Sequence, residues 1–328
     1  MCHPGGGVVL EKEEGSGMKF RLLLAFILFL PAVVLADSSA LILSGVPGSP
    51  DHAEKFAKWT EGTRKALVEK FGFSPERVLV LSDKKTAQAD VRAAFATLKQ
   101  QLKPTDSFFL FFIGHGSGEG DYKFNISGPD FTAAEYNKLL STLSVGRIVI
   151  VNGTSASGGA IEAFAGKNRI IVTATRSGQE GNDTVFYEYF LEALQSTAAD
   201  EDKDQKISVW EAFKYASAAV ERFYKEEGRL ATEHPQISDN GADKTGATIK
   251  DPPLLARSTS FQVDRPIVSS DPRVQALLNE KKDLEQKIEF LRVNKAATPD
   301  AEYEKQLEDL FVQLALKNQE ISQQEKKK

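Results

Sequence analysis

The chain has 328 residues, of which 41% are hydrophobic and 27% are charged, so it is long enough to bury a sizeable core and carry a second region beside it. Its 41 Lys and Arg residues against 46 Asp and Glu residues give a formal net charge of -5 at pH 7. No long basic block occurs along the chain, which argues against nucleic acid as a partner, because such partners require concentrated positive charge.

The N-terminal segment, residues 1–36, reads as a leader followed by a signal peptide. Lys19 and Arg21 precede an apolar run that closes with a small-residue cleavage pattern at Ala36. The run contains a proline and is shorter than the roughly 20 residues that a permanent membrane helix needs. We therefore expect translation to start at Met18, cleavage after Ala36, secreted or periplasmic localisation and no stable membrane insertion; an uncleaved anchor is the alternative.

Cysteine chemistry is absent from the expected mature chain. The single cysteine, Cys2, lies in the leader. After processing we therefore expect no disulfide, no thiolate metal site and no cysteine nucleophile.

Downstream of the leader, short apolar runs alternate with amphipathic stretches. The runs are nearly continuous in β-branched or aromatic residues, which is typical of strands covered on both faces, and they lie at 40–46, 77–81, 107–113, 147–151 and 169–175. The amphipathic stretches predict helices at 52–71, 87–102, 132–143, 158–165, 184–194 and 209–227. This alternation predicts a three-layer α/β domain over 37–263, with a mainly parallel sheet of about six strands.

Two of the predicted strands end in turns that could carry chemistry. The strand at 107–113 is followed by His115 between two glycines, which allow a sharp turn and leave the imidazole at the strand end. The strand at 147–151 is followed by a small-residue turn, 152–159, that opens a helix. Carboxyl ends of parallel strands are where sites of α/β proteins lie.

Together the two turns resemble those of the legumain and caspase-like cysteine peptidases. In that family a strand ending in His-Gly is followed by a strand ending in a Cys-x-Ser-Gly turn, and the histidine and cysteine form a catalytic dyad. The resemblance, over roughly 40–235, places His115 at the family histidine, 157–158 at the Ser-Gly pair and Ser155 where the cysteine belongs. It implies a caspase-like fold, with Gly116 as a backbone donor for the oxyanion.

Two departures from the family pattern lie beside this chemistry. Ser155 replaces the cysteine, and 153–154 is Gly-Thr in place of the usual acidic-Ala pair. A serine hydroxyl needs an aligned base within about 3 Å and usually a third group that orients the base. We therefore expect a degenerate peptidase that binds a protein or peptide ligand. A serine-dependent peptidase or esterase that uses Ser155 and His115 is the alternative.

Arg176 and Glu180 follow the strand at 169–175 and lie at the same strand-end surface in this topology. They are candidate substrate-binding residues for a charged ligand. Solvated loop charges are the simpler interpretation.

Residues 200–211 match the calcium-binding loop of an EF-hand. Oxygen donors recur at positions one, three, five, seven, nine and twelve: Asp200, Asp202, Asp204, the carbonyl of Lys206, Ser208 and Glu211. Position six, where the loop needs a left-handed turn that glycine adopts most easily, is Gln205. The Ser-x-x-Glu spacing is also a helix capping box, which is compatible with metal binding. We predict a structural calcium ion here and no organic cofactor.

Beyond about Asp264 the composition changes, and leucines and isoleucines recur at heptad-like spacing on both sides of a Thr-Pro break at 298–299. This pattern predicts an antiparallel helical hairpin over 264–328. Each arm has only two or three heptads, so it must pack on its mate, on the main domain or on another subunit. Packing within the chain is the simpler interpretation; self-association through 265–328, with a role in assembly, is the alternative.

Overall fold

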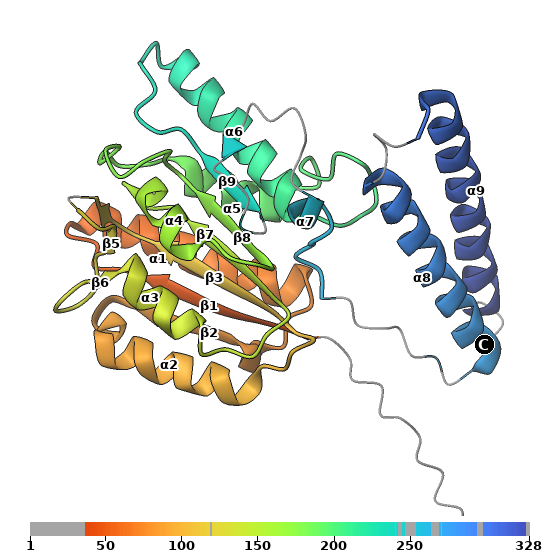
Figure 1. The fold of residues 1–328 in the computed structure, drawn as a ribbon, viewed down its shortest axis with the longest axis horizontal. Helices are drawn as coiled ribbons and strands as arrows, with labels where there is room; N and C mark the ends of the chain where they lie inside the picture. Colours follow the sequence, from red (N-terminus) through yellow and green to blue (C-terminus); the bar gives the residue numbers. More distant parts are fainter. Residues whose placement is uncertain are drawn as a thin grey trace, which may run out of the picture. The chain divides into compact units, whose positions relative to one another are not determined.

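A sheet of seven strands, counted over the residues described, forms the centre of the α/β domain in the computed structural model (Figure 1). The structure describes residues 37–118, 120–239, 241, 245–246, 254–263, 269, 271–293 and 298–325. The strand order is β10-β9-β8-β7-β3-β1-β2. The parallel strands are β1 (Ser38–Ser44), β2 (Val78–Ser82), β3 (Ser107–Ile113), β7 (Arg147–Asn152) and β8 (Arg169–Thr173). At one edge, β9 (Gln236–Asp239) and β10 (Thr245–Gly246) run antiparallel.

Helices cover both faces of this sheet, which is why its strands are apolar throughout. Ala40 and Ile42 of β1 belong to one buried cluster, whereas Leu41 and Leu43 belong to a second cluster on the opposite face. The first face is covered by α1 (Pro50–Lys65), α5 (Phe186–Gln195) and α6 (Val209–Glu226). The second is covered by α2 (Gln88–Gln101), α3 (Ala133–Leu140) and α4 (Ile161–Phe164). The predicted three-layer α/β architecture with a mainly parallel sheet is confirmed.

The first helix differs in detail from its predicted range. It begins at Pro50, after Ser49 has accepted a hydrogen bond from the backbone N–H of His52 at 3.2 Å. Proline is favourable there because its missing N–H is not needed in the first turn. The last turn, Ala66–Lys70, is a π-helix. The cap therefore fixes the position of His52 at the start of the helix.

Short strands were not anticipated. Directly after β3, a small sheet, three-stranded over the described residues, consists of β4 (Gly116–Ser117), β5 (Lys123–Phe124) and β6 (Phe131–Thr132). These strands and β9 have too few residues for a readable apolar pattern. The small sheet matters for the site, because β4 begins immediately after His115.

The C-terminal region forms the predicted helical hairpin. It comprises α8 (Pro272–Val293) and α9 (Asp300–Glu325), which pack on one another. Leu284 and Leu291 of α8 and Ile321 of α9 are buried, and an ion pair of 2.8 Å joins Lys317 of α9 to Glu280 of α8. The heptad-like spacing therefore corresponds to a buried seam between two helices.

The predicted start at Met18, the cleavage after Ala36 and the leader cysteine lie outside the described residues. Within the described part of the chain, no helix combines the length and the apolar character that a membrane span requires.

Candidate functional site

His115 and Ser155 meet at the carboxyl ends of adjacent parallel strands. β3 pairs with β7 in a register that sets Phe112 beside Asn152, so the turns that follow the two strands approach each other. Gly114 turns the chain with φ at 145°, a conformation that side-chain-bearing residues rarely adopt. At Gly116 an added Cβ would lie 2.5 Å from the carbonyl oxygen of Ser155. Gly116 is therefore needed for the close approach to Ser155, and Gly114 for the turn before His115.

The Ser155 hydroxyl is engaged by the backbone of Gly116. It donates to the Gly116 carbonyl at 2.9 Å and accepts from the Gly116 N–H at 3.2 Å. The side chain is 5% exposed. The hydroxyl proton thus points to a carbonyl oxygen rather than to the imidazole, and the N–H that was expected to serve an oxyanion already has an acceptor.

His115 is held by a backbone carbonyl and faces a carboxylate. Its Nε2 lies 3.1 Å from the carbonyl oxygen of Pro47, and because a carbonyl only accepts, Nε2 carries the proton in this contact. Its Nδ1 lies 3.4 Å from Oδ1 of Asp183. Both ring nitrogens therefore contact groups other than Ser155.

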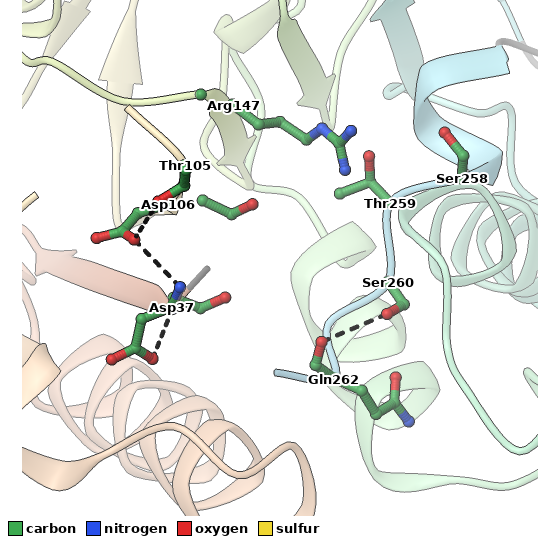
Figure 2. A pocket seen from close by; sticks show the side chains of 11 residues that line it. Asp37, Thr105, Asp106, Arg147, Ser258, Thr259, Ser260 and Gln262 are labelled. Carbon is green, nitrogen blue, oxygen red and sulfur yellow. Dashed lines mark hydrogen bonds between the residues drawn. The ribbon is translucent and has the colours of Figure 1, made fainter. Parts of the chain in front are cut away.

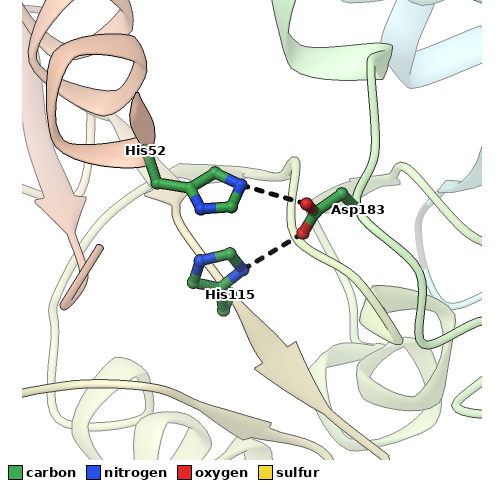
Figure 3. Close-up of side chains that lie close together, drawn as sticks. All are labelled: His52, His115 and Asp183. Atoms are coloured by element: carbon green, nitrogen blue, oxygen red, sulfur yellow. Dashed lines mark hydrogen bonds and ion pairs between the residues drawn. The ribbon is translucent and has the colours of Figure 1, made fainter. Parts of the chain in front are cut away.

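A second histidine, His52 at the start of α1, shares the same carboxylate (Figure 3). Its Nε2 lies 3.0 Å from Oδ2 of Asp183, and its Nδ1 lies 2.9 Å from the hydroxyl of Ser49. The two imidazole rings meet edge to face with centroids 4.6 Å apart. The sequence offers no pattern that relates His52 or Asp183, in the loop before α5, to His115; only folding brings them together.

The space beside these groups is small. A cavity of about 10 Å³ is bordered by polar residues and by two aromatic rings: His52, His115, Ser155, Asp183, Phe56 and Trp59. Lys55 also lines it, with its ammonium 4.6 Å from the Trp59 ring centroid. This volume suits about one water or ion.

The Gly-Thr departure before Ser155 has a packing explanation. A Cβ at Gly153 would lie 2.3 Å from the Tyr187 ring. Thr154 is fully buried and its hydroxyl lies 2.8 Å from the hydroxyl of Tyr122, whose pKa is raised by burial. An acidic side chain at 153 cannot be placed here without moving the Tyr187 ring.

The Ser-Gly pair after Ser155 joins the turn to the end of β8. The Ser157 hydroxyl accepts from the N–H groups of Ala174 and Thr175 at 3.1 and 3.2 Å. A Cβ at Gly158 would lie 2.2 Å from the Arg176 carbonyl carbon. Both positions therefore have structural roles in this fold.

Arg176 and Glu180 contact each other. The Arg176 Nε lies 3.0 Å from Oε1 of Glu180, and the same oxygen lies 2.6 Å from Nδ1 of His234. Oε2 accepts from the backbone N–H groups of Arg176 and His234 at 2.9 and 3.2 Å. Glu180 is thus a loop-fixing carboxylate, whereas the Arg176 side chain is 62% exposed at the strand-end surface.

At position six, the Asp-rich loop has the left-handed backbone conformation expected from the calcium pattern. Gln205, at position six, adopts the left-handed conformation with φ at 68°. Carboxylate oxygens of Asp200, Asp202 and Asp204 lie within 4.8 Å of one another. Burial of its carboxylate raises the pKa of Asp204 to about 6, and Asp202 and Glu211 add to the rise. The loop therefore concentrates negative charge, as a cation site does.

The end of this loop is also a capped helix start. The Ser208 hydroxyl accepts from the backbone N–H of Glu211 at 3.1 Å, while Oε2 of Glu211 accepts from the Ser208 N–H at 2.9 Å. Oε1 of Glu211 accepts from the backbone N–H of Glu201 at 3.0 Å. The backbone N–H of Lys206 donates to Asp204 Oδ1 at 2.8 Å. These hydrogen bonds join both ends of the loop to each other. The predicted capping box is present.

A larger cavity, of about 320 Å³, lies at the amino ends of the strands, away from the predicted site residues (Figure 2). The guanidinium of Arg147 extends toward Thr259 at its border, and burial lowers the pKa of Arg147. Asp106 faces the cavity but is held by Arg77 at 2.8 Å and by the Asp37 N–H at 3.1 Å. No site residue predicted from the sequence borders it.

No family model matches this chain, and no curated protein matches it. Among solved structures, the crystal structure of protein GSU0716 from Geobacter sulfurreducens is similar over 70% of this chain and 100% of its own length. The identity is 15% and the TM-score is 0.45.

Proposed function

We propose that this chain is a degenerate legumain/caspase-like protein, secreted or periplasmic, that binds a protein or peptide ligand instead of cleaving it. The observation that carries the proposal is the hydroxyl of Ser155, whose proton is donated to the Gly116 carbonyl at 2.9 Å. A catalytic serine must pass that proton to a base as it attacks. In this site both ring nitrogens of His115, the expected base, contact other groups.

The surroundings of Ser155 favour the same conclusion. Ser155 is 5% exposed, and the adjoining cavity is small, about 10 Å³. The Gly116 N–H, which would stabilise an oxyanion, already donates to the hydroxyl at 3.2 Å. Attack by Ser155 would therefore require the turn to open, and the small β4 sheet holds that turn in place.

Ligand binding is proposed for the strand-end surface around β3, β7 and β8. Arg176 is 62% and Asp183 59% exposed there, and Lys55 lies beside Asp183 at the small cavity. Charges of both signs favour a polar peptide segment as the ligand, because such groups give orientation through charge-assisted hydrogen bonds.

Hydrolysis assays test the non-catalytic role. The full chain is incubated with peptide and ester libraries in the presence of calcium, beside Ser155→Ala and Ser155→Cys. We expect no turnover by the natural chain or by Ser155→Ala. Turnover that depends on Ser155 would overturn the proposal and establish a serine hydrolase.

The serine hydrolase alternative has one favourable observation, which is that folding does place Ser155 and His115 on neighbouring strand ends. A Ser155→Cys variant tests whether the rest of the expected catalytic site is intact. Because a thiol ionises more readily than a hydroxyl, activity gained only by Ser155→Cys would show an intact site frame without its nucleophile.

A structural calcium ion at 200–211 is part of the proposal. Left-handed Gln205 and the three convergent carboxylates support it. Isothermal titration of the full chain is expected to show calcium binding at millimolar concentration or below, weakened in Asp202→Asn. Absence of binding at millimolar calcium would contradict the proposal of a structural calcium ion at 200–211.

A role in assembly through the hairpin has its own observation. Phe311, Val312 and Leu316 of α9 are 38%, 53% and 54% exposed, which is unusual for large apolar side chains on one helix. Light scattering of the full chain beside a Val312→Asp, Leu316→Asp variant tests it. Identical monomeric masses would count against assembly.

A further inference from the structure

Two imidazoles and one carboxylate converge on a single point at the strand-end surface (Figure 3). His52 comes from the start of α1, His115 from the end of β3, and Asp183 from the loop before α5. One nitrogen of each histidine and an oxygen of the aspartate all lie within 4.8 Å of one another. Of these three residues, only Asp183 also belongs to the ligand-binding surface proposed above.

The hydrogen bonding of His115 leaves a lone pair facing an anion. Its Nε2 proton is fixed by the Pro47 carbonyl at 3.1 Å, and a neutral imidazole carries only one proton. Its Nδ1 therefore directs a lone pair at Oδ1 of Asp183, 3.4 Å away. Two such groups repel each other unless a cation lies between them.

His52 can join the same cation without losing its partner. The Ser49 hydroxyl, 2.9 Å from Nδ1, both donates and accepts, so it serves either tautomer of His52. With the proton on Nδ1, the Nε2 lone pair points to Oδ2 of Asp183 at 3.0 Å. Filling both contacts with protons alone would require an imidazolium at His115 beside Lys55, because the Nε2 proton of His115 is already donated to Pro47, whereas His52 could donate from Nε2 as a neutral ring. One divalent ion satisfies all three donors at once.

We propose that His52, His115 and Asp183 bind a first-row divalent transition-metal ion, with Zn²⁺ the best fit. The separations of 3.0 Å from His52 to Oδ2 and 3.4 Å from His115 to Oδ1 of Asp183 involve different carboxylate oxygens, and each is near the roughly 3.3 Å between two ligand atoms of a zinc ion with bonds of about 2 Å. Imidazole and carboxylate together suit zinc, whereas calcium and magnesium prefer oxygen donors alone. The Pro47 carbonyl and the Ser49 hydroxyl orient the two rings from behind, as outer partners of metal ligands do.

The proposed site is accessible and has an open position. The side chains of His52, His115 and Asp183 are 27%, 24% and 59% exposed, so an ion can enter from solvent. Three protein ligands leave the fourth tetrahedral position for water or for a carboxylate or carbonyl of a bound partner. The ammonium of Lys55 lies at the same cavity and lowers the affinity for a cation.

Zinc titration of the untagged full chain tests the site. Cys2 and His3 are replaced by serine and alanine so that the sequence retains His52, His115 and His234 as its histidines, and excess calcium occupies the Asp-rich loop. Calorimetry is expected to give one zinc ion per chain. His52→Ala and Asp183→Asn should each weaken zinc binding by at least about tenfold, a scale typical of disturbed metal sites.

His234→Ala is the matched control, because His234 also pairs with a carboxylate, at 2.6 Å from Glu180. It should change zinc affinity by no more than about twofold. Substituted Co²⁺ should give the strong visible absorption of a tetrahedral site, lost in His52→Ala. A folded parent chain that binds no stoichiometric zinc, or zinc binding that is equally strong in His52→Ala and Asp183→Asn, would overturn the proposal. Greater weakening by His234→Ala than by His52→Ala would also overturn it.

Discussion

Replacement of Ser155 by alanine should destabilise the fold, because the hydroxyl ties together the turns after β3 and β7. It removes one hydrogen bond to the Gly116 carbonyl at 2.9 Å and one from the Gly116 N–H at 3.2 Å. Each such bond contributes about 0.5–1.5 kcal/mol. Gly116 is half-buried, so water replaces part of the loss, and we expect the free energy of unfolding to fall by about 1–2 kcal/mol.

Urea unfolding followed by tryptophan fluorescence measures this change. The two tryptophans, Trp59 and Trp210, both pack in the core of the α/β domain, so the signal reports that domain rather than the hairpin. Ser141→Ala is the control, since its hydroxyl makes an exposed bond within one helix end, and it should change stability by less than about 0.5 kcal/mol. Catalytic residues are often strained, and their removal often stabilises a protein. Equal or greater stability of Ser155→Ala would therefore refute the structural role of this hydroxyl.

Three further predictions concern packing, the Asp-rich loop and the hairpin. Gly153→Glu, which introduces the acidic residue of the family pattern, should cost at least about 3 kcal/mol because its Cβ would lie 2.3 Å from Tyr187; a soluble variant with unchanged urea midpoint would contradict this. Burial raises the pKa of Asp204 to about 6 in the folded chain, so the folded state binds the proton more tightly than the unfolded chain does. Without calcium, the contribution of this group to stability should therefore decrease as pH rises from about 4 to 6. Calcium must displace that proton, so the rise in Tm on adding calcium should be larger at pH 7.5 than at pH 5. This difference between the two pH values should shrink in Asp204→Asn. A rise in Tm that does not depend on pH would contradict calcium binding by Asp204. Leu284→Ala and Leu291→Ala, in the buried seam of α8, should each lower hairpin helicity on heating, with a cost of about 2–3 kcal/mol; unchanged melting by circular dichroism would show that the seam is not what holds α8 and α9 together.

The central strands were predictable because parallel strands buried on both faces are almost continuously apolar. β3 spans Ser107–Ile113, the same range that the sequence predicts, and β7 extends its predicted run by one residue to Asn152. β9 could not be predicted, because Gln236–Asp239 is four residues long and three of them are polar. Local patterns identify an element only when it is long enough to show its period.

The strand-end location of the site was also predictable, whereas its hydrogen bonding was not. Parallel pairing of β3 and β7 brings His115 and Ser155 to the same edge, as their positions after two strands imply. The direction of the Ser155 hydroxyl depends on the Gly116 backbone, which no side-chain pattern encodes. His52 and Asp183 are 131 residues apart and meet only through tertiary folding.

The measurement that tests the non-catalytic role most directly is labelling of the full chain with a fluorophosphonate, a reagent that reacts with activated serines by forming a bond from Oγ to phosphorus as fluoride leaves. Peptide mass spectrometry then reads the state of Ser155. Because the hydroxyl proton is held by the Gly116 carbonyl, we predict no adduct at Ser155, with or without calcium. An adduct at Ser155 that disappears in His115→Ala would contradict the account and show that the serine and the histidine work together as nucleophile and base.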